Sequence, residues 1–195
     1  MKNGWDSSFY VYNKSMAAKK MKGLIKSWTA KIFSPKRPLD EVSGLYLGGR
    51  NYLHVTSQPS GRPEYVSGIS GVVTRFEMAF RYGNIGLIAH NYLAGKHFLE
   101  LQPGKMIHLM DGKGRTRLYR VTRILQYQAL NPRSPRSNFI DLETHAFSTA
   151  AEVFERVYMG KHHLVLQTCI QKGNIEEWGR HFVIAEPVKF APPSR

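Results

Sequence analysis

The single cysteine of this chain and one arginine have the types and spacing of a reactive pair. Cys169 follows Thr168 at the end of an apolar run, and Arg180 begins the next run of β-favouring residues. A polar, glycine-containing segment separates the two runs, so we expect two strands joined by a loop. A guanidinium that faces a thiol favours the thiolate, which is the nucleophilic form. Cys169 is therefore a candidate nucleophile.

A histidine stands at the exit of another expected strand, because residues 85–90 read Ile-Gly-Leu-Ile-Ala-His. If His90 meets Cys169 and Arg180, the three groups have the chemistry of acyl transfer. The thiolate attacks a peptide carbonyl, His90 handles the protons of the leaving and incoming amines, and Arg180 stabilises the oxyanion. Each group also has a structural alternative, as a buried spare thiol, a core histidine or a charge at a barrel rim.

The elements that must position these groups are short β-favouring runs separated by turns rich in Gly and Pro. A helix is expected where Thr149 and Glu152 have capping-box spacing, and a second helical turn fits within residues 91–101. Closure removes unpaired strand edges, so this pattern favours an all-β barrel of about eight strands. The expected strands cover residues 45–47, 52–55, 65–69, 72–80, 85–90, 106–110, 117–130, 163–170 and 180–185.

The same runs resemble a known family, the sortases, which are cysteine transpeptidases of bacterial cell surfaces. The similar segments are 85–90 (Ile-Gly-Leu-Ile-Ala-His), 164–169 (Leu-Val-Leu-Gln-Thr-Cys) and 180–185 (Arg-His-Phe-Val-Ile-Ala), and the order agrees over about residues 40 to 188. The resemblance implies an eight-stranded sortase-like barrel with His90, Cys169 and Arg180 as its catalytic residues. It also implies a sorting-type peptide of the Leu-Pro-x-Thr-Gly kind and an amine acceptor. Ala89 departs from the glycine that sortases commonly have there.

Three neighbouring residues are candidates for contact with the substrate. Thr168 precedes the cysteine, Asn91 follows the histidine, and Trp178 lies two residues before Arg180. Each also has a structural alternative, since Thr168 can fill a β position and Trp178 can pack. The histidines have no metal-ligand spacing, and one cysteine excludes both an internal disulfide and a Cys cluster. We therefore expect no metal and no cofactor.

The positive charge is concentrated at the N-terminus. The net charge is +14 over 195 residues, and the first 38 residues carry +8 of it. Residues 15–33 have apolar side chains at helical spacing, including Trp28, between lysines, which predicts a basic amphipathic helix. This helix either lies in a membrane interface or docks on the domain. We expect an arm over 1–38, a barrel domain over 39–188 and a tail over 189–195.

Three functions remain open at this level. The first is a sortase-like cysteine transpeptidase that acts outside the cytoplasm at a membrane or cell wall, although no signal peptide or transmembrane segment is visible. The second is a sortase-fold binding module whose thiol is idle and whose basic helix docks to an anionic membrane or wall polymer. The third, a nucleic-acid-binding barrel, is disfavoured because residues 39–195 carry only +6 and their aromatic residues follow core periodicity.

Overall fold

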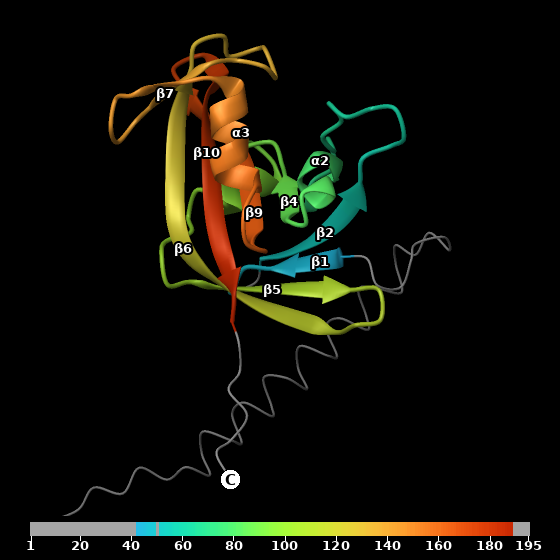
Figure 1. Ribbon diagram of the computed structural model, residues 1–195. Helices are drawn as coiled ribbons and strands as arrows, with labels where there is room; N and C mark the ends of the chain where they lie inside the picture. Colours follow the sequence, from blue (N-terminus) through green and yellow to red (C-terminus); the bar gives the residue numbers. More distant parts are fainter. Residues whose placement is uncertain (1–41, 50, 189–195) are drawn as a thin grey trace, which may run out of the picture. The chain divides into compact units, whose positions relative to one another are not determined.

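The computed structural model describes residues 42–49 and 51–188 (Figure 1). The expected arm and its amphipathic helix, over residues 1–38, lie outside the described residues, as does the tail over 189–195. Among the described residues, no helix combines the length and the apolar character needed to cross a bilayer.

Eight strands form a closed ring. Their pairing order is β10–β9–β4–β3–β2–β1–β5–β6, and β6 pairs with β10 to complete the barrel. The predicted all-β, eight-stranded barrel is therefore confirmed. The bounds of these strands are β1 (Val42–Tyr46), β2 (Tyr52–Ser57), β3 (Val72–Phe76), β4 (Ile85–Ile88), β5 (Met106–Asp111), β6 (Thr116–Ala129), β9 (Leu164–Lys172) and β10 (Ile175–Pro187).

The remaining elements lie outside this ring. β7 (Phe139–Asp141) pairs with the end of β6, and β8 (Phe147–Ser148) pairs with β7. Neither of these two short strands was predicted. The helices are α2 (Glu77–Arg81), a 3-10 turn η1 (Ala94–His97) and α3 (Ala150–Tyr158). Both predicted helical segments are thus present, and α2 is additional.

Side chains alternate between two cores along the paired strands. Inward residues of β9 and β10, such as Leu166 and Val183, belong to the core within the barrel. Outward residues of the same strands pack under α3, where Phe182 lies in one cluster with Val153 and Val157. This alternation follows from the period of two in a strand. It assigns the residues of β4, residues 164–170 of β9 and residues 179–185 of β10 to a face.

Two expected strands differ from the observed chain. Residues 65–69 form a loop, because side chains replace a strand ladder there: Gln58 Nε2 donates to the Tyr65 carbonyl, and Ser67 N donates to Thr74 Oγ1. The run over 72–80 divides into β3 and α2. The Gln58 Oε1 atom accepts from Glu77 N at 3.0 Å, which supports the first turn of this helix.

The N-terminal cap of α3 generates the first prediction. Thr149 accepts from Glu152 N, and the Glu152 carboxylate accepts from Thr149 N at 2.7 Å, so a capping box is formed as predicted. Thr149→Ala should lower the free energy of unfolding by about 1 kcal/mol, measured by urea denaturation. Thr149→Ser retains the hydroxyl and is the matched control. An equal loss in both variants would show that the hydroxyl is not the stabilising group.

Candidate active site

His90, Cys169 and Arg180 all lie on the outer face of three neighbouring strands. On β9, Leu164 and Leu166 face the barrel interior, so Cys169 faces outward. The same alternation, counted from the inward Val183 on β10 and the inward Leu87 and Ala89 at β4, turns the other two residues outward. The sheet order β4–β9–β10 therefore brings together the three residues that the sequence had singled out.

The parallel register of β4 and β9 aligns His90 with Cys169. Ile88 pairs with Gln167. One residue further, Ala89 N donates to the Gln167 carbonyl at 3.1 Å, which repeats the pattern of Ile85 N to the His163 carbonyl at the start of the pair. His90 and Cys169 each lie two residues beyond the last pair of this ladder, Ile88 and Gln167. Adjacent strands lie about 4.8 Å apart, so this register, continued past the end of β4, would set the two residues level with each other.

The antiparallel register of β9 and β10 places Arg180 directly opposite Cys169. Both residues lie within this long hairpin rather than at the strand ends that the sequence suggested. Three guanidinium hydrogens of Arg180 are occupied: Nη1 donates to the carbonyls of Glu177 and Gly179, and Nη2 donates to the Pro132 carbonyl at 3.0 Å. Within the described residues, Nε–H and the second Nη2 hydrogen are left for a ligand.

A bulge in β10 lies next to the cysteine. Lys172 pairs with Ile175 and Ile170 pairs with Gly179, so residues 176–178 of β10 stand opposite Gln171 alone. Bulges of this kind re-aim side chains and are common beside active sites. Trp178 is half-buried in this bulge, and the Lys172 ammonium lies 4.6 Å from the centre of its ring. Trp178 therefore forms part of the surface beside Arg180.

Asn91 and Thr168 both make contacts within the protein. Asn91 Nδ2 donates to the Glu176 carbonyl at 3.1 Å, which ties the segment after His90 to the bulge of β10. Thr168 is 1% exposed, and its hydroxyl donates to the Ala89 carbonyl at 2.8 Å. Thr168 thus fixes the backbone next to His90. Its side chain faces the barrel interior, away from the face that carries Cys169.

Tyr92 and Gly95 lie next to His90, and neither was predicted from the sequence as a residue of the site. The Tyr92 ring stacks on His90 with 5.2 Å between ring centres, and it is 58% exposed. Gly95 lies against the same backbone, where its N–H donates to the His90 carbonyl at 2.9 Å. An added Cβ would contact Thr168 Oγ1 and lie 2.7 Å from the Ala89 carbonyl oxygen. A tyrosine and a glycine have no reactive group or motif spacing here that would identify them from the sequence.

Burial and the neighbouring charges act on the pKa of the Cys169 thiol, and the net shift is upward. Burial raises the pKa of the Cys169 thiol above its ordinary value. Arg180 lowers this pKa, and Glu177 and Glu176 raise it, so the net shift is upward. The neutral thiol is therefore the main form at neutral pH, and Arg180 is the group that favours the thiolate. Among residues 42–49 and 51–188, no three His, Cys, Asp or Glu side chains are grouped so that they could hold a metal ion.

Comparisons with known proteins give likenesses in structure alone. Neither a protein-family model nor a curated protein sequence matches the chain. Sortase C from Clostridium perfringens SM101 has a TM-score of 0.46 at 15% identity, over 76% of this chain and 70% of that one. The Clostridium perfringens sortase C structure with the C-terminal cell wall sorting motif gives 0.46 at 17% identity, over 78% and 74%. Sortase A from Listeria monocytogenes gives 0.46 at 12% identity, over 77% and 88%.

The charges around the thiol predict how its reactivity depends on pH. The rate of Cys169 alkylation by iodoacetamide should reach half its maximum above pH 8.5, the approximate pKa of a free cysteine. Arg180→Gln should move this midpoint upward, because the thiolate loses a neighbouring cation. Glu177→Gln should move it downward, because an anion is removed. Arg136→Gln is the control for Arg180, and an unchanged midpoint in Arg180→Gln would contradict this assignment of charges.

The close approach of Gly95 gives a further prediction. Gly95→Ala should lower the free energy of unfolding by about 1–3 kcal/mol, because the new methyl group meets the backbone of Ala89 and His90. Urea denaturation measures this loss. Gly68→Ala is the matched control, since a Cβ there meets no atom within 4 Å. Equal stability of the two variants would argue against the packing of η1 on the His90 segment.

Proposed function

We propose that this chain is a sortase-like cysteine transpeptidase that cleaves a sorting-type peptide through an acyl-thioester on Cys169. The observation that supports the proposal is the register of β4, β9 and β10: Arg180 pairs with Cys169, and the β4–β9 ladder ends two residues before His90 and two residues before Cys169. A buried structural thiol has no need of two such neighbours. The sequence resemblance to sortases assigns the same three residues to catalysis.

In the proposed reaction, Cys169 and His90 act both when the thioester forms and when it is resolved. The Cys169 thiolate attacks the peptide carbonyl, and the two unoccupied N–H groups of Arg180 donate to the developing oxyanion. His90 donates a proton to the leaving amine, which releases the C-terminal part of the peptide. The incoming amine then attacks the thioester and gives up a proton to His90, while the Cys169 thiolate leaves. Water in place of the amine would give hydrolysis.

The raised pKa of the thiol limits the reactive fraction of the enzyme. A substrate that covers Cys169 would add to the desolvation of the thiolate, so Arg180 must offset this cost during attack. We assign Thr168 and Asn91 to positioning, because their hydrogen bonds hold the backbone on both sides of His90. Trp178 walls the site on the side of β10. The acceptor amine would approach past Glu176 and Glu177.

The second candidate function is a binding module whose thiol is idle. The upward shift in the pKa of Cys169 favours it, because burial makes the thiol less reactive than a free cysteine at neutral pH. In this case the barrel would dock to an anionic membrane or wall polymer without chemistry at the site. For both candidates we place the protein outside the cytoplasm, at a membrane or cell wall.

Trapping of the acyl-thioester separates the two functions. Incubation with Leu-Pro-x-Thr-Gly-type peptides should add the mass of the N-terminal peptide fragment to Cys169, as measured by intact-mass and peptide mass spectrometry. Cys169→Ala should show no adduct. His90→Ala should slow its formation by about 100-fold or more, and Arg180→Gln by about 100- to 1000-fold.

Two observations make this experiment decisive. Arg136→Gln, which replaces an exposed arginine in the β6–β7 loop, should form the adduct at the unsubstituted rate. The absence of any adduct across a library of such peptides, with Cys169 alkylated no faster than free cysteine, would favour the idle module.

A further inference from the structure

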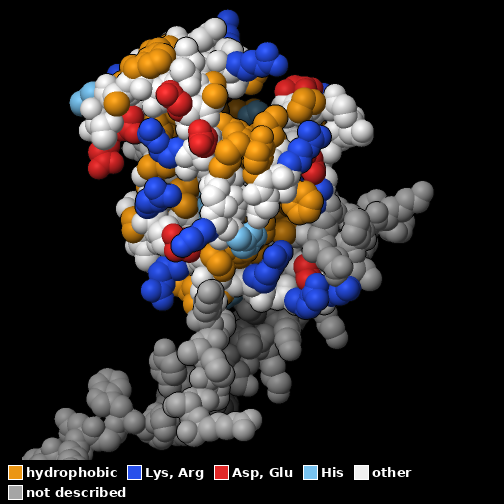
Figure 2. Space-filling model, in the orientation of Figure 1, with side chains coloured by type: hydrophobic (Ala, Val, Ile, Leu, Met, Phe, Trp, Pro, Cys, Tyr) orange, Lys and Arg blue, Asp and Glu red, His pale blue; other side chains and the backbone are white. Residues whose placement is uncertain are grey.

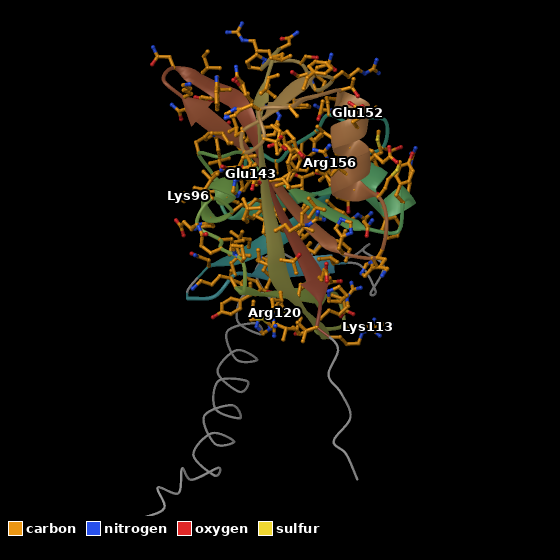
Figure 3. The ribbon with its side chains drawn as sticks, turned by 60° about the vertical axis from the view of Figure 1, so that its left-hand side comes forward. Lys96, Lys113, Arg120, Glu143, Glu152 and Arg156 are labelled. Carbon is orange, nitrogen blue, oxygen red and sulfur yellow. The ribbon has the colours of Figure 1, made fainter. Side chains whose placement is uncertain are left out.

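Six exposed basic side chains gather at the end of the barrel that the β5–β6 hairpin forms. We call this group the basic end, and its members are Lys105, Lys113, Arg115, Arg117, Arg120 and Arg123. Asp111 is the one acidic residue in the sequence from 105 to 123, and its Oδ2 lies 2.7 Å from Arg115 Nε. Figure 3 shows Lys113 and Arg120 at this end of the domain, and Figure 2 shows Lys and Arg side chains over the lower part of the face in view.

The opposite end of the barrel is close to neutral. β7 pairs with residues 127–129 of β6, and the β9–β10 turn lies at that same end. Residues 129–158 and 170–180 together hold six acidic and five basic side chains, whereas residues 105–123, with Glu186 opposite Arg120, hold two acidic and six basic. Such an asymmetry orients a protein in the field of a charged surface. The basic end would face an anionic surface.

Both ends of the described chain lie next to the basic end. Val42, the first residue of β1, pairs with Asp111 in the hairpin, and Val188 N donates to the Leu118 carbonyl at 2.8 Å. Residues 1–38, which end a few residues before β1 in the sequence, carry +8 and the amphipathic spacing around Trp28. The basic end and this basic, partly apolar sequence are therefore joined by a few residues.

We propose that the basic end docks onto an anionic lipid surface and holds the candidate active site away from it. Clustered Lys and Arg side chains are attracted to anionic headgroups, and each contributes to binding within a Debye length of the surface. The sequence before β1 has apolar residues at helical spacing between its lysines, which suits a lipid interface, whereas a hydrophilic polymer or nucleic acid offers no place for them. Lipid is therefore the surface that fits both features.

Strand β10 runs from the candidate active site to the basic end and so separates the two. Arg180 pairs with Tyr127 of β6 and Pro187 pairs with Tyr119, so seven residues separate the site from the basic end along one strand. At about 3.3 Å per residue this is roughly 23 Å. A domain docked by its basic end would present the outer face around Cys169 to the aqueous side, where an extended peptide can reach it. This docking is independent of any chemistry at the thiol.

Vesicle binding by the full chain tests the proposal. The chain should co-sediment with vesicles of phosphatidylglycerol and phosphatidylcholine, and much less with phosphatidylcholine alone. The triple variant Lys105→Gln, Arg117→Gln, Arg120→Gln should bind the anionic vesicles about tenfold or more weakly. The matched triple variant Lys96→Gln, Arg133→Gln, Arg136→Gln removes the same charge elsewhere and should bind like the unsubstituted chain.

Hydrogen exchange on the unsubstituted chain provides a second measurement that needs no variant. Anionic vesicles should protect amides in residues 105–123 and leave those in 169–180 unchanged. Three results would overturn the proposal: equal weakening by both triple variants, unchanged binding of the basic-end variant, or protection at 169–180 without protection at 105–123. Binding to soluble poly(glycerol phosphate) but not to anionic vesicles would overturn it as well, in favour of a wall polymer.

Discussion

The hydrogen-bonded register of β4, β9 and β10 is the constraint on which the site depends. A shift of one residue in any of these pairs would turn a candidate group toward the other face of the sheet. The register is held from inside, because inward residues such as Leu87, Leu166 and Val183 fill the barrel and are fully buried. The core of the barrel therefore determines which polar groups meet on its outer surface.

Local contacts then hold the backbone around the candidate residues. The 3-10 turn brings Gly95 against the His90 carbonyl, and Thr168 holds the carbonyl of the preceding residue from within the barrel. The bulge in β10 carries Trp178, whose ring lies under the Lys172 ammonium. The Arg180 guanidinium also ties the β6–β7 loop to the site through the Pro132 carbonyl.

The features that could be predicted from the sequence were marked by a repeating residue pattern or by a reactive side chain. Alternating apolar runs and turn residues predicted the barrel, and the Thr149–Glu152 spacing predicted the helix cap. The residues with reactive side chains could be named, but their faces followed only from the observed register. Residues 65–69 were wrongly assigned to a strand, because β-favouring types do not reveal that Gln58 and Thr74 satisfy this backbone through side-chain hydrogen bonds. Tyr92 was not predicted, because only its position in the structure, stacked on His90, relates it to the site.

The proposed site requires contact between residues 90 and 169. A His90→Cys variant, oxidised mildly, should form a disulfide with Cys169, because residues level with each other on adjacent strands are about 4.8 Å apart, within the span of about 4.4–6.8 Å between Cα atoms that a disulfide bridges. Mass spectrometry of the digested protein should show the two peptides joined. If Cys169 stays fully alkylatable after oxidation while the variant remains folded, the register and the site built on it are wrong.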